Sequence, residues 1–281
     1  MNIKIISDST CDLPRALVEK YNICIFPLTV IKNGENFRDN ETITPADIFA
    51  HVAAGGALCS TAAGNVGEYE ELFARYAADY DGVVHVNIGS GFSSSYQNAC
   101  LAASEFDNVI VIDSQNLSTG QGLIVLKAAQ LASEATDLQQ LKASIEAFVP
   151  KVESSFVLDQ LKYMAKGGRC SSVAALGANL LNLKPCIEVR DSKMSVVKKY
   201  RGTYSKCLAN YVKDRLAGRE DIDPETLFLT YTPVTNEDLA AVKSAIAEHG
   251  SFFSNIYEGH TGCTVSCHCG PGTLGVLFIR K

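Results

Sequence analysis

Short apolar runs rich in β-branched residues alternate with longer segments of helical pattern along most of the chain. The predicted strands are residues 3–6, 23–31, 83–88, 109–112, 155–158, 186–189, 194–199, 227–230, 264–267 and 275–279. The predicted helices are residues 14–20, 45–53, 68–78, 94–105, 119–132, 138–148, 173–181, 204–216 and 236–249. Strands that alternate with helices of this length indicate α/β layers with mostly parallel sheets.

Residues 184–201 interrupt this alternation. They predict two strands joined by a tight turn at residues 190–193, and such a hairpin indicates a second domain of different architecture. The 281 residues also suffice for about two domains of ~150 residues. We therefore divide the chain into an N-terminal α/β domain at 1–155 and a C-terminal α/β domain at 156–281.

Charge and composition exclude several classes of protein. The net charge of −6 argues against a nucleic-acid binder that works through bulk positive charge. With 47% hydrophobic and 20% charged residues, the chain is not largely disordered. No apolar stretch reaches the ~18 residues of a membrane helix, and the N-terminus does not resemble a signal peptide. We expect a soluble cytoplasmic protein whose ten cysteines are reduced.

Hydroxyl-rich or glycine-rich segments follow several predicted strands, where α/β proteins form their ligand crevices. These segments are residues 7–12, 60–65, 89–95, 113–122 and 166–171. Residues 89–95 place three serines before a helix, where hydroxyls and backbone N–H groups can bind a phosphate or a carboxylate. A plain serine cap would need only one of the three. Asp12, just before Pro14, is expected to cap the helix that begins there.

Cysteines and histidines gather near the C-terminus, at His260, Cys263, Cys267, His268 and Cys269. These residue types bind metals, but the spacing lacks the paired Cys-x₂₋₄-Cys knuckles of a structural zinc site. A strand at 264–267 would also point His268 away from its two cysteine neighbours. We expect no metal or cofactor, with the cysteines acting as small buried hydrophobic residues.

Recognised catalytic motifs are missing from the sequence. It contains no Gly-x-Ser-x-Gly elbow, no phosphate loop and no Gly-x-Gly-x-x-Gly after the first strand. Serines without an evident activating base favour binding over covalent catalysis. Two alternatives stay open: a hydrolase of esters or phosphates with Ser93 as nucleophile and His268 as base, and a cysteine/histidine metal or redox protein.

Taken together and in order, these segments resemble the DegV family of bacterial fatty-acid-binding proteins from end to end. The matching segments are residues 6–13, 26–28, 89–97, 111–114, 161–163, 166–169, 181–185, 199–202 and 268–272. The resemblance implies a three-layer α/β/α N-terminal domain with a mostly parallel sheet and hydroxyl-rich head-group loops. It also implies a C-terminal α/β domain with a mixed sheet that closes over the acyl chain.

The family pattern also implies roles for single residues. The carboxylate of a long-chain fatty acid would be held by Thr61 and Ser93, with His268 near the head group. Ser94 replaces a family glycine beside Ser93, and Arg169 would contribute to the head-group surface or to partner docking. The family's Thr-Ser-Gln-Pro-Ser motif reads Thr-Ala-Ala-Gly-Asn at residues 61–65, which makes the pocket mouth less polar.

The resemblance further implies a carrier rather than an enzyme. Family members present the bound fatty acid to a separate fatty acid kinase, which converts it to acyl phosphate. Arg201 would help to dock that kinase. Transient exchange of the acid at a membrane surface is compatible with this role.

Overall fold

A computed structural model describes residues 1–174 and 183–281 of the chain. The predicted helix at 173–181 therefore lies almost entirely outside the described residues, and the short helix α8 (Ser171–Ala174) covers its beginning. Among the helices of the described residues, none is long and apolar enough to cross a membrane.

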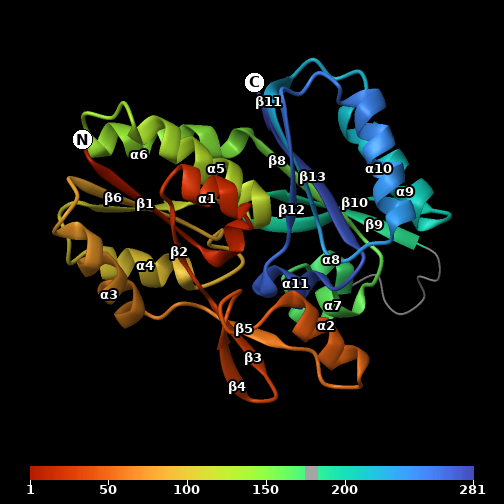
Figure 1. Ribbon diagram of the computed structural model, residues 1–281, viewed down its shortest axis with the longest axis horizontal. Coiled ribbons are helices and arrows are strands. Elements are labelled where there is room, and N and C mark those ends of the chain that lie inside the picture. Colours follow the sequence, from red (N-terminus) through yellow and green to blue (C-terminus); the bar gives the residue numbers. More distant parts are fainter. Residues whose placement is uncertain (175–182) are drawn as a thin grey trace.

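The N-terminal half of the chain forms a parallel sheet between two helical layers (Figure 1). Its strands, in spatial order, are β2 (Cys24–Phe26), β1 (Ile3–Asp8), β6 (Gly82–Asn87) and β7 (Val109–Asp113). One face is covered by α1 (Arg15–Lys20), α5 (Ser118–Ala132) and α6 (Leu138–Phe148), and the other by α3 (Val66–Ala77) and α4 (Ser95–Ala103). Successive strand residues point to opposite faces, so Ile5 packs with α5 whereas Ile6 packs with α3. The predicted three-layer arrangement is confirmed.

The second sheet is mixed and has six strands. In spatial order they are β10 (Lys193–Arg201), β9 (Leu183–Arg190), β8 (Val152–Leu158), β13 (Thr273–Arg280), β11 (Ile222–Tyr231) and β12 (Asn255–His260). Only β11 and β12 pair in parallel among these described strands. The helices α9 (Tyr204–Leu216) and α10 (Asn236–His249) cover one face. The α/β class with a mixed second sheet is confirmed, whereas the division at residue 155 stays a prediction.

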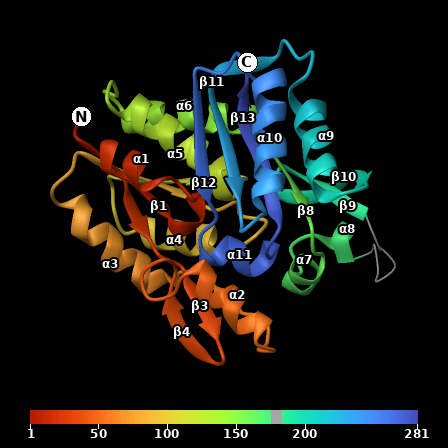
Figure 2. The ribbon, with the colours of Figure 1, turned by 45° about the vertical axis from the view of Figure 1, so that its right-hand side comes forward.

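Helix α5 lies between the two sheets and joins their cores. Its buried residues Leu123 and Ile124 pack in one cluster with Ile112 of the parallel sheet and with Phe228 and Leu277 of the mixed sheet. A helix that is apolar on nearly all sides is expected in such a position. Figure 2 shows α5 passing behind the strands of the mixed sheet.

A small third sheet projects from the N-terminal half (Figure 1). It is antiparallel and contains β3 (Thr29–Lys32), β4 (Glu35–Arg38) and β5 (Ser60–Ala62), with α2 (Pro45–Ala53) in the connection. The predicted single strand at 23–31 is wrong, because the chain leaves the parallel sheet after Phe26. Pro27 has no N–H for a ladder bond, and the Leu28 N–H donates to Ser9 Oγ (3.1 Å) instead.

The predicted strand at 264–267 is also wrong, because this segment is the helix α11 (Cys263–Cys269). Buried carboxylates hold its first turn: Asp12 accepts from the Gly262 N–H (2.7 Å), and Asp39 accepts from the N–H groups of Cys263 (2.7 Å) and Thr264 (3.1 Å). The sequence predicts that Asp12 caps α1, and this prediction is wrong: the residue at the N-cap is Pro14, and no described side chain caps the helix. His268 lies on a helix rather than at the end of a strand.

Other elements were not predicted from the sequence. They are β4, β5, β12, the helix α7 (Lys162–Gly167) and the short 3₁₀ helices at Ser9–Cys11 and Val149–Lys151. The hairpin of β9 and β10 is confirmed. Its turn residues Asp191 and Ser192 adopt left-handed backbone angles, with φ of 50° and 55°, which match the twist of a tight hairpin.

Candidate functional site

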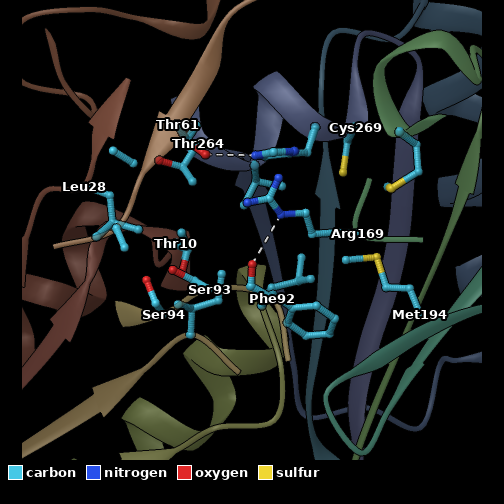
Figure 3. A pocket seen from close by; sticks show the side chains of 17 residues that line it. Thr10, Leu28, Thr61, Phe92, Ser93, Ser94, Arg169, Met194, Thr264 and Cys269 are labelled. Carbon is cyan, nitrogen blue, oxygen red and sulfur yellow. Dashed lines mark hydrogen bonds between the residues drawn. The ribbon is translucent and has the colours of Figure 1, made fainter. Parts of the chain in front are cut away.

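A pocket lies where the small sheet, the parallel sheet and α11 meet (Figure 3). Its free space, including the open mouth, is about 730 Å³. The five predicted ligand-site residues all line it: Thr61, Ser93, Ser94, Arg169 and His268. They come from β5, from the loop between β6 and α4, from the loop after α7, and from α11.

Thr61 and His268 form a polar contact in this pocket. Thr61 Oγ1 lies 2.9 Å from His268 Nε2. The other ring nitrogen, Nδ1, is buried and has no hydrogen-bond partner among the described residues. It faces Gly167, where an added methyl group would lie only 2.5 Å away. We assign the ring proton to Nε2, because a proton on Nδ1 would bury an unpaired N–H donor.

This assignment sets the direction of the hydrogen bond. Burial, assisted by the positive charge of Arg169, lowers the pKa of His268 to about 4, so the ring is neutral at pH 7. The neutral ring donates its Nε2–H to Thr61 Oγ1. The Thr61 hydroxyl therefore keeps its own proton free to donate into the pocket.

Ser93 is engaged locally. Its Oγ accepts the Ser95 N–H (3.1 Å) and lies 2.9 Å from Ser95 Oγ. Within the described ranges, no hydrogen bond joins Ser93 to His268, and no carboxylate orients the free side of the imidazole. The nucleophile, base and orienting group of a hydrolase are thus not assembled here.

The loop that carries Ser93 is held from two sides. Asp113, at the end of β7, accepts from the Ser90 N–H (3.0 Å) and Ser90 Oγ (2.6 Å). On the other side the loop packs against the β9–β10 turn, where a methyl group added at Gly91 would lie 2.1 Å from the Ser192 carbonyl oxygen. Gly91 is needed for this close approach between the two halves of the chain.

Arg169 lies at the exposed edge of the pocket. Its Nη1 donates to the Gly167 carbonyl (2.7 Å) and its Nε to the Phe92 carbonyl (3.4 Å), which links the loop after α7 to the serine loop. Among the described residues that line the pocket, Arg169 is the only Lys, Arg, Asp or Glu. Arg201, at the end of β10, is exposed and is not among the lining residues.

Apolar side chains form most of the remaining wall, including Leu28, Ile88 and Phe92. A second, smaller void shares Leu117, Val265 and Cys269 with the pocket and lies beside the mixed sheet and the first residue of α5. The site therefore combines hydroxyl groups near α11 with apolar walls. That combination suits a molecule with one polar end and a long apolar part.

Sequence reasoning missed several lining residues, namely Thr10, Met164, Met194 and Thr264. Thr10 follows β1 in the hydroxyl-rich segment at residues 7–12, but its partner Gln121 (2.8 Å) is 111 residues away. Thr264 was missed because the sequence predicts a strand at 264–267, which does not place Thr264 on the same helix face as His268. Met164 and Met194 carried no signal beyond ordinary hydrophobic residues.

The cysteines are free thiols, and most of them are buried. In the part of the chain that the structure describes, no group of three or more His, Cys, Asp or Glu side chains is arranged to hold a metal ion. Burial raises the pKa of Cys269 to about 12, so this thiol in the pocket wall stays protonated.

Comparisons with known proteins agree with this architecture. A DegV domain-containing protein from Clostridium acetobutylicum is 31% identical over 285 residues, covering 99% of each chain. A solved DegV family protein from Thermus thermophilus, described by its fatty acid binding, has a TM-score of 0.90 at 28% identity and covers 100% of both chains. DegV from Bacillus subtilis, described as a fatty acid binding protein, has the same fold, with a TM-score of 0.82, 24% identity and 100% coverage of both chains.

The family assignment rests on the whole length of the chain. A family model described as an uncharacterised protein of the DegV family matches residues 2–281, which leaves out only the first residue. The two sheets, the serine loop and α11 all lie within that match. The chain belongs to the DegV family.

Proposed function

We propose that this protein binds a long-chain fatty acid, with the carboxylate on the hydroxyls of Thr61 and Ser93. The observation that carries the proposal is the 2.9 Å contact between His268 Nε2 and Thr61 Oγ1. With the ring proton assigned to Nε2, the Thr61 hydroxyl keeps its proton to donate to an anion. His268 acts through Thr61 rather than as a charged partner. The Thermus thermophilus relative, described by its fatty acid binding, supports the same class of ligand.

The apolar part of the ligand is expected to follow the path past Leu117 and Val265 toward α5. Each buried CH₂ group contributes ~0.8 kcal/mol, so a sixteen-carbon chain gains on the order of ten kcal/mol before the costs of binding. A ligand bound this tightly would remain on the protein through purification.

Denaturing extraction of the purified protein, followed by lipid mass spectrometry, tests the proposal directly. A stoichiometric fatty acid would support it and would reveal the preferred chain length and saturation. A protein that carries no lipid, and whose melting temperature is unchanged by added fatty acids, would contradict it.

The proposal extends to a partner. We infer that the bound acid is presented to a separate fatty acid kinase that forms acyl phosphate, and that the exposed Arg201 contributes to docking. Because Arg201 is not among the pocket-lining residues, Arg201→Ala should leave fatty acid affinity unchanged and lower the rate of acyl phosphate formation by the kinase. Equal loss of affinity and of phosphorylation would instead assign Arg201 to ligand binding.

A further inference from the structure

Thr264 is a buried residue of the pocket wall whose hydroxyl has no partner. Its exposed fraction is 6%, and Oγ1 makes no hydrogen bond to any described residue. It precedes His268 by four residues on α11, so the two side chains share one face of the helix, and both line the pocket. Figure 3 shows Thr264 among the side chains that surround the cavity.

Three other hydroxyls around the pocket have partners. Thr10 Oγ1 donates to Gln121 Oε1 (2.8 Å), Thr61 contacts His268, and Ser93 contacts Ser95. A buried polar group without a partner is unfavourable to stability, so its presence in a well-packed wall calls for an explanation.

The fold itself does not need this hydroxyl. The N–H of Thr264 donates to Asp39 (3.1 Å), and any residue other than proline would supply that donor. The contact nevertheless fixes the position of Thr264, because Asp39 also accepts from the neighbouring Cys263 N–H. The backbone of Thr264 is therefore fixed beside the pocket, and its buried hydroxyl has no hydrogen-bond partner among the described residues.

We propose that Thr264 is a further ligand-binding residue, whose hydroxyl donates a hydrogen bond to the carboxylate of the bound fatty acid. This inference rests on the fatty acid function proposed above. It adds a donor from α11 to those from β5 and the serine loop. It also accounts for the retention of an unpaired hydroxyl in a wall that is otherwise largely apolar.

The test is the nearly isosteric variant Thr264→Val, titrated with oleate after removal of bound lipid. We expect the affinity for oleate to fall about tenfold, as for the loss of one hydrogen bond to a charged group. The melting temperature of the lipid-free variant should stay the same or rise, since an unpaired buried hydroxyl is removed. Thr264→Ser, which keeps the hydroxyl, should retain most of the affinity.

Two further measurements make the result specific. Oleyl alcohol, which has the same chain without a carboxylate, should bind Thr264→Val and the unchanged protein with nearly equal affinity. Thr232→Val serves as the matched control, because Thr232 is buried outside the pocket and its Oγ1 accepts the Thr273 N–H (2.8 Å). This control should lower the melting temperature and leave oleate affinity unchanged.

Failure of this inference and failure of the proposed function give different results. If the unchanged protein binds oleate and Thr264→Val binds it equally well, only the role of Thr264 is overturned. A lower melting temperature with unchanged affinity would show that the hydroxyl serves the fold, and would likewise overturn it. If the unchanged protein binds no fatty acid, the proposed function fails, and this inference fails with it.

Discussion

At the scale of single residues, the neutral state of His268 matters most. Burial and the nearby Arg169 lower the pKa of this ring to about 4. Only the family resemblance predicts that Thr61 and His268 belong to the same site. The two residues are 207 positions apart, and neither spacing nor composition predicts their hydrogen bond or the burial that keeps the ring uncharged.

The depressed pKa has a consequence for stability. In the unfolded chain a histidine titrates near pH 6.5, so the unfolded state binds more protons than the folded state between about pH 6.5 and 4. The free energy of unfolding should therefore fall as the pH is lowered through that window, by up to about 3 kcal/mol from this residue. Urea denaturation of the lipid-free protein at several pH values measures it.

The matched variant for this measurement is His268→Gln. It removes the titrating group, so its stability should depend less steeply on pH between 6.5 and 4. Burial lowers the pKa of His85 to about 3, so this residue also makes stability fall at low pH. Its effect is the same in both proteins and cancels from the comparison. Parallel pH profiles for the two proteins would contradict the account of His268.

At the scale of elements, local signals decided which predictions succeeded. The helix at 45–53 was predicted with the bounds of α2, because Thr44 and Pro45 mark its start locally. The β9–β10 hairpin was likewise predicted from a local signal, the tight turn at residues 190–193. The helix α11 was missed because the carboxylates at its first turn, Asp12 and Asp39, lie more than 220 residues earlier.

Removing one of these carboxylates should weaken the whole site. Asp39→Asn keeps the size of the side chain but loses the negative charge that accepts from Cys263 and Thr264 N–H groups. Hydrogen bonds to charged groups contribute roughly 1.5–3 kcal/mol each, and the asparagine oxygen can still accept one of the two, so we expect a loss of about 1.5–3 kcal/mol in the free energy of unfolding. Urea denaturation measures the loss, and oleate affinity should fall as well.

Asp47→Asn is the control for Asp39→Asn. Asp47 also accepts a backbone N–H, that of Thr44 (2.9 Å), but it does so at the exposed start of α2. Asp47→Asn should therefore lower the free energy of unfolding much less than Asp39→Asn and leave oleate affinity unchanged. Similar effects of the two substitutions would show that Asp39 has no special role in holding α11.

At the scale of the whole molecule, the pocket joins all three sheets. The α/β class and the two large sheets could be predicted from periodicity and from the family resemblance. The small sheet could not be predicted, because its strands have only three or four residues each. Strands this short show no clear alternation of apolar and polar residues. The packing of the β9–β10 turn on the serine loop was likewise invisible in the sequence.

That contact between the two halves can be tested at Gly91. In Gly91→Ala the new methyl group would lie 2.1 Å from the Ser192 carbonyl oxygen, so the hairpin turn and the serine loop must separate. We expect a loss of about 1–3 kcal/mol in the free energy of unfolding, as for other overpacked sites, together with weaker oleate binding. Calorimetry and ligand titration measure the two effects.

Gly67→Ala provides the comparison for Gly91→Ala. Gly67 lies in α3, where the nearest atom to an added methyl group is Asn65 Oδ1 at 3.4 Å. Alanine has the higher helix propensity, so this variant should be as stable as the unchanged protein or more so. Unaltered stability and affinity in Gly91→Ala would mean that the hairpin turn does not position the serine loop.

The anchoring of α11 by Asp12 and Asp39 also sets an order of events during synthesis. A ribosome that adds roughly 5–20 residues per second makes α11 about 10–50 s after these two aspartates. Throughout that interval these two carboxylates lack the amide donors of α11. The amide donors of α11 arrive only at the end of that interval, so the pocket that α11 helps to line is completed late in synthesis.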